Sequence, residues 1–224
     1  MPIHVPAAAV KKPPADPVNA KDFQAISEVS DDTLGRLAAL AGLLGKWQDK
    51  VNLVGPGTQD DVWRRHMLDS AQLARFLPSA ARAVADIGSG AGFPGLVLAI
   101  MARDGPCRYH LIESNERRSA FLTEANRLTQ AGAIIHNSRV EKLPFLNADV
   151  IVARAVAPLT KLLEYAILHL SKDGQCLFMK GRKWREELTE AQKSWIMKES
   201  TMSSLSDSSG VVLKLEDISR RDDS

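Results

Sequence analysis

Cysteine and long apolar runs are both scarce in this chain. Only two cysteines, Cys107 and Cys176, occur among 224 residues, and they lie far apart and outside any CxxC pair. This spacing excludes a disulfide framework and a cysteine zinc site, and it suits a reducing cytoplasm. No apolar run approaches the ~20 residues that a membrane-spanning helix requires. The sequence therefore predicts a cytoplasmic protein without a membrane segment.

Charge of one sign is not in excess either. Lys and Arg number 29 against 27 Asp and Glu, which leaves a net charge of +2 at pH 7. A protein that wraps nucleic acid in uniform basic charge is thereby excluded, so any nucleic-acid contact must be a local patch. The five histidines are scattered, and no metal site is predicted. With 45% hydrophobic residues, the chain can bury a sizeable core.

The N-terminal residues differ in composition from the rest of the chain. Residues 1–20 are rich in proline and alanine and lack the apolar stretch of a signal peptide, so we expect a disordered tail there. Helical patterns follow at 30–51, with Ser30 as the N-cap, and at 59–77, before Pro78. We predict a helical extension over 21–78, and a main domain over 79–224 that forms one globular unit with it. The protein is predicted to be a monomer.

From residue 83 onward, short apolar runs alternate with amphipathic helices. This alternation is typical of an α/β fold, a mostly parallel sheet with right-handed crossovers. The predicted strands lie at 83–87, 108–112, 133–136, 149–153 and 174–179. Toward the C-terminus the pattern is weaker, and it predicts a helix over 184–197, a loop over 200–209 and an edge strand over 210–215.

A glycine-rich turn follows the first predicted strand. Residues 86–92 (DIGSGAG) fit the DxGxGxG pattern of S-adenosylmethionine enzymes, and residues 90–95 (GAGFPG) fit the GxGxxG pattern of dinucleotide enzymes. Asp86 would repel a pyrophosphate but complements the sulfonium and ammonium groups of S-adenosylmethionine, and Gly88 follows the strand immediately. Glu113 ends the next strand, where a carboxylate can accept ribose hydroxyls from either cofactor. A tight turn without a ligand is the structural alternative.

Six motifs then occur in order along the chain: NL at 52–53, RHMLDS at 65–70, DIGSGAGFPG at 86–95, SRVE at 138–141, ARAVA at 153–157 and MKG at 179–181. Together they resemble the RsmG (GidB) family of 16S rRNA guanine-N7 methyltransferases. The resemblance implies a Rossmann-like class I S-adenosylmethionine-dependent methyltransferase fold with an N-terminal helical extension. It also implies methyl transfer from S-adenosylmethionine to N7 of a guanine, position 527 in the 530 loop, with 16S rRNA or the 30S particle as partner.

The candidate cofactor-binding residues lie at the carboxyl ends of the predicted strands: Asp86, Gly88, Gly90, Phe93, Glu113, Val140, Glu141 and Arg154. The resemblance implies that Gly88 and Phe93 line the pocket, and that Val140 and Glu141 lie beside the adenine. It implies that Arg154 faces the methionine end of the cofactor or the incoming base. The structural alternative is an ion pair with Glu141 or Asp86. The turn at 206–210 (SDSSG) departs from the Gly-x-Arg-like turn of many relatives, so the resemblance alone implies no RNA contact there.

Two further groups allow a structural and a functional interpretation. His66 and Asp69, three residues apart, share an apolar helix face. They form either a buried pair that ties this helix to the sheet or a site at the pocket mouth. Lys180, Arg182 and Lys183 follow the fifth predicted strand beside a tryptophan. They form either a solvated helix start or an RNA-binding patch that grips phosphates, and their place at the sheet edge favours RNA.

The chemistry implied by the resemblance needs no general base, because guanine N7 carries a lone pair and no proton. It needs the base, flipped out of its stack, in line with the methyl–sulfur bond. We therefore expect catalysis by positioning, with His66, Asp69 and Arg154 as candidates. Two alternatives stay open: an NAD-dependent oxidoreductase, against which the position of Asp86 argues, and a catalytically silent RNA-binding module.

Overall fold

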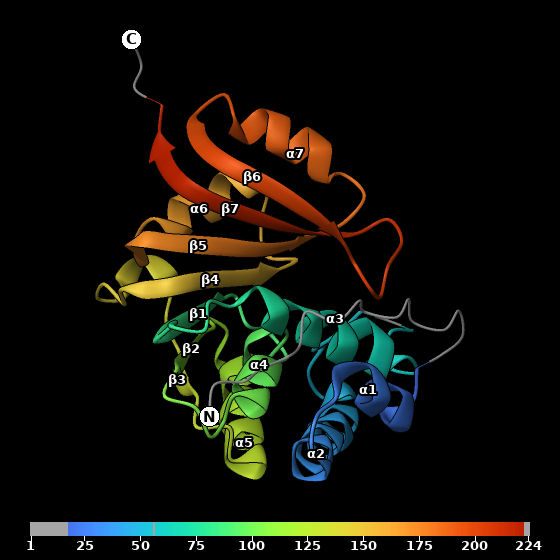
Figure 1. Cartoon of the computed structure of the whole chain (residues 1–224). Coiled ribbons are helices and arrows are strands. Elements are labelled where there is room, and N and C mark those ends of the chain that lie inside the picture. The colour runs from blue at the N-terminus through green and yellow to red at the C-terminus, as the bar shows by residue number, and fades with distance from the viewer. Residues whose placement is uncertain (1–17, 56, 222–224) are drawn as a thin grey trace.

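Seven strands form one sheet in the order β3-β2-β1-β4-β5-β7-β6 in the computed structural model, which describes residues 18–55 and 57–221 (Figure 1). Strands β1 to β5 pair in parallel, whereas β7 runs antiparallel to both β5 and β6. The strands are β1 (Ala83–Ile87), β2 (Arg108–Ile112), β3 (Ile134–His136), β4 (Ala148–Arg154), β5 (Leu170–Lys180), β6 (Trp195–Ser203) and β7 (Val211–Arg220). The predicted α/β fold with a mostly parallel sheet is confirmed.

Helices cover both faces of this sheet. One side carries α1 (Ala20–Ser27), α2 (Asp31–Gln48), α3 (Asp69–Ala71), α4 (Gly95–Met101) and α5 (Glu116–Thr129), and the other carries α6 (Leu159–Ala166) and α7 (Trp184–Ala191). Successive side chains of a strand point to opposite faces. Val150 of β4 therefore packs in the core on the α2 side, and Ile151 packs in the core on the α6 side. Burial on both faces explains why the central strands are continuous apolar runs.

Ordered structure begins earlier than the helical pattern near Ser30 indicates. Of the predicted tail over 1–20, residues 1–17 lie outside the described residues, Val18 is buried and α1 begins at Ala20. Asn19 caps this helix, and Phe23 anchors it with its ring centroid 5.4 Å from that of Trp63. The predicted N-cap of α2 is confirmed, since Oγ of Ser30 accepts a hydrogen bond from a backbone N–H in the first turn.

The single helix predicted over 59–77 is wrong in its regularity. The chain forms a π-helical turn, η1 (Trp63–Leu68), then α3, then a 3-10 turn, η2 (Gln72–Phe76). The backbone N–H of Asp69 donates to the carbonyl of Arg64, five residues earlier. Wide turns of this kind are frequent at functional sites, because they change the direction in which neighbouring side chains point.

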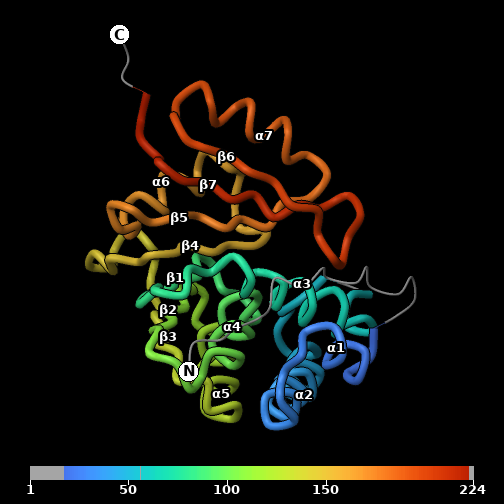
Figure 2. Tube along the Cα trace, viewed as in Figure 1, coloured from blue at the N-terminus to red at the C-terminus, as the bar shows by residue number. Residues whose placement is uncertain are grey.

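The C-terminal elements also differ from the predicted ones. The helix predicted over 184–197 ends as α7 at Ala191, and Trp195 instead starts β6. This strand forms because it pairs with β7, with Trp195 opposite Arg220. The predicted edge strand is β7, which lies inside the sheet between β5 and β6. The predicted loop shortens to the hairpin loop 204–210, which reaches toward α3 in Figure 2.

Candidate functional site

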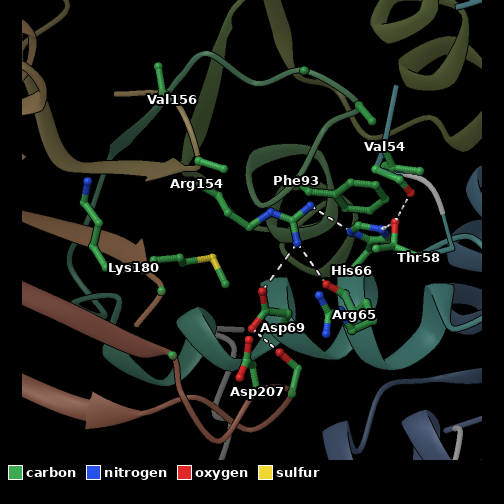
Figure 3. Close-up of a pocket in the computed structure, with 18 of the residues that line it drawn as sticks. Val54, Thr58, Arg65, His66, Asp69, Phe93, Arg154, Val156, Lys180 and Asp207 are labelled. Atoms are coloured by element: carbon green, nitrogen blue, oxygen red, sulfur yellow. Dashed lines mark hydrogen bonds and ion pairs between the residues drawn. The ribbon is translucent and has the colours of Figure 1, made fainter. Parts of the chain in front are cut away.

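A cavity of about 740 Å³ opens at the carboxyl edge of the parallel strands, where α/β sheets bind ligands. Its walls come from the turn after β1, the ends of β4 and β5, the η1 turn and the β6–β7 hairpin loop. Figure 3 shows side chains from these separate elements converging on Arg154. Seven of the predicted site residues line the cavity: His66, Asp69, Gly88, Gly90, Phe93, Arg154 and Lys180. Six lie outside its lining: Asp86, Glu113, Val140, Glu141, Arg182 and Lys183.

The glycine turn presents bare backbone to the cavity. Gly88 has φ +68°, a left-handed conformation that side chains rarely adopt. A Cβ atom placed there would lie 2.7 Å and 2.9 Å from the methyl carbons of Val156, on the loop after β4. Only glycine fits this position, because the backbone is left-handed and Val156 fills the space that a Cβ would take, and both residues line the cavity.

Asp86 lies beneath the turn and not in the cavity wall. Its side chain is buried, and Oδ2 accepts a hydrogen bond of 3.0 Å from the backbone N–H of Gly95. Oδ1 has no hydrogen-bond partner among the described residues. Burial raises the pKa of Asp86 to about 7. The direct contact with a cofactor expected for this carboxylate therefore stays a prediction, while its structural contact is with the start of α4.

Glu113 holds the same turn from the next strand. Oε2 accepts from the backbone N–H of Gly90 at 3.0 Å, and Oε1 accepts from that of Asn115 at 2.7 Å. Val140 and Glu141 belong to the short 3-10 turn η3 (Val140–Lys142), in which Val140 is buried and Glu141 is exposed. Their predicted positions beside an adenine stay predictions.

Arg154 is the centre of the cavity's polar network. Its guanidinium donates to Nδ1 of His66 at 2.8 Å and to the carbonyl oxygen of Arg65 at 2.9 Å, and it lies 3.4 Å from Oδ2 of Asp69. It also lies over the ring of Phe93, 5.2 Å from the centroid. The ion pair considered from the sequence, with Glu141 or Asp86, is thus replaced by one with Asp69.

His66 is held in its neutral form by this network. Since a guanidinium can only donate, Nδ1 of His66 must accept, and Nε2 carries the proton. Nε2 lies 3.0 Å from Oγ1 of Thr58, whose hydroxyl donates in turn to the carbonyl of Gly55. Burial and then the charge of Arg154 lower the pKa of His66 to about 3. Its ring stacks on Phe93 with centroids 4.8 Å apart.

Asp69 ties the cavity to the hairpin loop 204–210. Its Oδ1 accepts hydrogen bonds from the hydroxyls of Ser204 and Ser206 and from the amide of Gln72. His66 and Asp69 therefore both line the cavity and both reach the sheet, through Arg154. The structural tie to the sheet is thus present, and a role of the two residues in positioning a ligand stays a prediction. The sequence did not indicate the two serines, which lie 135 and 137 residues further along the chain.

The structure separates Lys180 from the rest of the predicted basic patch. Its ammonium is buried, 2.7 Å from Oε2 of Glu187 and 2.8 Å from the carbonyl of Ala157. Arg182 and Lys183 are exposed, outside the cavity lining. The predicted RNA contact of these three residues stays a prediction, and for Lys180 the buried ion pair supplies a structural role instead.

Two arginines outside the predicted site residues lie at the cavity; from the sequence, Arg118 is expected to be a solvated charge and Arg65 allows either a solvated or a functional interpretation. Arg65 is exposed on η1 and Arg118 is half-buried at the start of α5, and both line the cavity. Neither forms an ion pair within the described part of the chain. The signal available in the sequence was their position, Arg65 directly before His66 and Arg118 three residues after the helix cap Asn115.

Residues 18–55 and 57–221 contain neither a metal site nor a membrane-spanning helix. No group of three or more His, Cys, Asp or Glu side chains there could hold a metal ion. None of the helices in these ranges combines the length and the apolar character that crossing a bilayer requires.

Solved structures share the fold. The ribosomal protein L11 methylase from Lactobacillus delbrueckii subsp. bulgaricus aligns with a TM-score of 0.54 at 19% identity, over 69% of this chain and 77% of that chain. An O-methyltransferase from Bacillus cereus aligns with a TM-score of 0.54 at 10% identity, over 87% of this chain and 96% of that chain. At these identities the likeness shows the fold alone, and the predicted Rossmann-like methyltransferase fold is confirmed.

Sequence relatives are much closer. The ribosomal RNA small subunit methyltransferase G of Paramagnetospirillum magneticum is 50% identical over 194 residues, 87% of this chain and 93% of the relative. That of Rhodospirillum centenum is 49% identical over 208 residues, 93% of this chain and 95% of the relative. The family model described as GidB, rRNA small subunit methyltransferase G, matches residues 34–214. The resemblance read from the motifs is thus confirmed, and the chain belongs to the rRNA small subunit methyltransferase G family, RsmG or GidB.

Proposed function

We propose that this protein transfers the methyl group of S-adenosylmethionine to N7 of a guanine in 16S rRNA, the guanine at position 527 of the 530 loop. One observation carries the proposal: the glycine turn opens into a cavity whose histidine cannot act as a base. Both ring nitrogens of His66 are engaged, and its pKa is lowered to about 3. Methylation of a ring nitrogen that carries a lone pair and no proton is the chemistry that such a cavity suits.

The residues present fit S-adenosylmethionine. When bound, this group supplies a methyl on a positively charged sulfur. Gly88 and Gly90 would hold it against bare backbone, since both line the cavity with positive φ. Glu113 sets the position of the turn through Gly90 and has further lone pairs for ribose hydroxyls. An NAD-dependent oxidoreductase has no comparable support.

The chain's own contribution is to position the base. Arg154, His66 and Phe93 form a stacked, hydrogen-bonded wall in which each group is held by at least one other. A wall of fixed geometry can present a flipped base at near-attack distance without reorganising. As N7 forms its bond to the methyl carbon, the methyl–sulfur bond breaks and positive charge develops on the purine, so no proton has to move.

Radiolabelled methyl transfer tests the proposal. Small-subunit particles that lack the modification are incubated with labelled S-adenosylmethionine and the protein, and the modified nucleotide is mapped by mass spectrometry. We expect one 7-methylguanosine in the 530 loop. Particle binding without transfer would support a catalytically silent RNA-binding module instead. Label on another atom or another RNA would replace the proposed substrate.

We further propose that the protein acts in the cytoplasm as a monomer, on 16S rRNA or a 30S particle. Its thiols support a reducing compartment, because Cys107 and Cys176 are both free. Light scattering of the purified chain should give 24.5 kDa. A dimer mass would replace the monomer in the account and leave the chemistry unchanged.

A further inference from the structure

We propose that Asp207, on the hairpin loop between β6 and β7, recognises the Watson–Crick edge of the guanine, an inference that rests on the proposed function. Asp207 lines the same cavity as the glycine turn and Arg154. In Figure 3, Val156, which packs on Gly88, and Asp207 lie on opposite sides of Arg154. We therefore place the methyl donor at the Gly88 end of the cavity and the Watson–Crick edge of the base at the Asp207 end.

The carboxylate of Asp207 is fixed in one orientation. Its Oδ1 accepts two hydrogen bonds of 2.8 Å, from the backbone N–H and from the hydroxyl of Ser209. The loop itself is fixed, because Ser204 and Ser206 both donate to Asp69. Oδ2 of Asp207 receives no hydrogen bond within the described residues, so it keeps its acceptor capacity for a ligand.

Asp207 differs in this respect from the other acids of the cavity. Asp69 is paired with Arg154, and Glu187 is paired with the ammonium of Lys180. Asp207 forms no ion pair among the residues that the structure describes. Its hydrogen bonds from Ser209 lower its pKa, so the group is ionised at neutral pH. A charged acceptor without a protein partner in a binding cavity is placed to meet donors of the substrate.

Guanine is the nucleobase that offers such donors next to each other. Its Watson–Crick edge carries N1–H and the N2 amino group, whereas adenine presents the lone pair of N1 at the corresponding place. A carboxylate accepts from the first edge and repels the second, and enzymes that act on a flipped base commonly read this edge. N7 lies at the opposite end of the purine, which leaves it free to face the methyl donor.

The same contact strengthens during the reaction. Methylation at N7 places a positive charge on the purine ring, which makes N1–H more acidic and a better donor. A fixed carboxylate at that edge therefore binds the transition state more tightly than the ground state, which is the condition for raising kcat. Asp207 would thus contribute to both base selection and rate.

A cycle that pairs a side-chain change with a change in the base tests this role. Asp207→Asn keeps an oxygen that can accept from Ser209 and replaces the other oxygen with a donor. Small-subunit particles are reconstituted with guanosine or with inosine, which lacks the N2 amino group, at the target position. For the parent protein we expect kcat/KM to fall roughly 10- to 100-fold on inosine, the range for a hydrogen bond to a charged group. For Asp207→Asn we expect a similar fall on guanosine and an inosine penalty below about 3-fold.

Matched measurements separate recognition from folding. The inosine penalty is a ratio within one protein, so a smaller active fraction does not change it. Asp173→Asn makes the same change on an exposed residue at the opposite end of β5, and it should keep parental rates. Affinity for S-adenosylhomocysteine should stay within about 2-fold in both variants. An Asp207→Asn protein with a parental rate and the parental inosine penalty would overturn the assignment. A parent protein that methylates neither particle would overturn the proposed function and this inference with it.

Discussion

Nη2 of Arg154 lies 2.8 Å from Nδ1 of His66, so an arginine at the end of β4 donates to a histidine 88 residues earlier in the chain. This bond fixes the tautomer of the histidine and keeps it neutral. It also joins the π-helical turn to the sheet at the point where the glycine turn opens into the cavity. His66 is buried, Arg154 is nearly buried and both line the cavity, so their hydrogen bond supports the fold and also shapes the surface that a ligand would contact.

Arg154→Ala should lower both the stability of the fold and the rate of methyl transfer, and the rate should fall much further. The change removes the donor to Nδ1 of His66 and the ion-pair partner of Oδ2 of Asp69, whose Oδ1 keeps its three hydrogen bonds, and this costs about 1–3 kcal/mol of unfolding free energy. Methyl transfer per folded molecule should fall by more than about 100-fold, because the wall that positions the base loses its centre. Urea denaturation gives the first quantity and a labelled transfer assay gives the second. Parental transfer by the folded fraction would mean that Arg154 only braces the loops.

The histidine should give the protein a pH-dependent contribution to stability. Folding lowers the pKa of His66 from its ordinary 6.5 to about 3. Between these values the unfolded chain binds a proton that the folded chain does not. The stabilising contribution is therefore complete above pH 6.5 and is lost as the pH falls toward 3, at about 1.4 kcal/mol per pH unit.

Asp86 has the opposite effect on the pH dependence of the unfolding free energy. The contribution of His66 is therefore measured as a difference between the parent protein and a variant that lacks the histidine. The pKa of Asp86 rises from 3.8 to about 7 on folding, and its contribution is lost as the pH rises through that interval. We expect the difference in unfolding free energy between parent and His66→Asn to grow as the pH rises from 4.5 to 6 and to level off near pH 7. Denaturation at four pH values measures it. A difference that does not change with pH would show that the folded His66 titrates normally.

Gly88→Val should abolish cofactor binding in a folded protein. Valine would have to adopt φ +68° and would collide with Val156. Adding Val156→Ala removes the collision, so the double variant should regain stability. The β-branched side chain introduced at position 88 still covers the backbone that the cofactor would contact. Calorimetric titration with S-adenosylhomocysteine should show no binding for either protein. The control Gly35→Ala, on an exposed helix position with open space around it, should bind normally. Recovery of affinity in the double variant would assign the turn a structural role only.

The two arginines at the cavity should contact RNA phosphates. Replacing Arg65 and Arg118 with glutamine should weaken binding to small-subunit rRNA and flatten the slope of log K against log[salt] by roughly 0.7–0.9 per lost contact. Lys172→Gln, an exposed lysine at the opposite end of β5, provides the matched control and should leave the slope unchanged. Filter binding at four salt concentrations gives these slopes. Equal slopes in the double variant and the parent would reduce the pair to solvated surface charge.

Lys180→Met should act on stability and not on the salt dependence. It removes the ammonium that donates to Glu187 and to the carbonyl of Ala157, while Glu187 keeps a hydrogen bond from the backbone N–H of Leu159, and the loss costs about 1–3 kcal/mol. Thermal melting should show the loss, whereas the salt slope of RNA binding should match that of the parent. A flattened slope at unchanged melting temperature would restore Lys180 to the RNA-binding patch.

The parts of the fold that could be predicted from sequence are those set by local pattern. Strand β1, its glycine turn and helix α4 follow one another within about twenty residues, and each has its own signal. Strand β6 could not be predicted, because Trp195 fits the helical pattern that precedes it. The residue becomes part of a strand only through its pairing with Arg220 of β7, which lies beyond a loop. Helix α1 was missed because one buried ring, that of Phe23, anchors it to a distant tryptophan.

For the candidate site too, some features could be predicted from local sequence and others depend on the folded chain. The positions of Gly88, Phe93 and Arg154 at strand ends could be predicted, because parallel strands bring their carboxyl ends to one edge. The partners of those residues could not. The ion pair of Lys180 with Glu187 and the link from Asp69 to the hairpin loop join side chains whose proximity only the folded chain determines.

Replacement of the target guanine with 7-deazaguanine tests whether N7 is the atom that receives the methyl group. This base keeps the Watson–Crick edge and the ring shape but has carbon in place of N7, so it should enter the cavity without offering a nucleophile. We expect particles that carry it to bind the protein with parental affinity and to accept no labelled methyl group at that position. Methyl transfer to the 7-deazaguanine nucleotide at a rate comparable with that of guanine would contradict the account, since the acceptor would then be another atom.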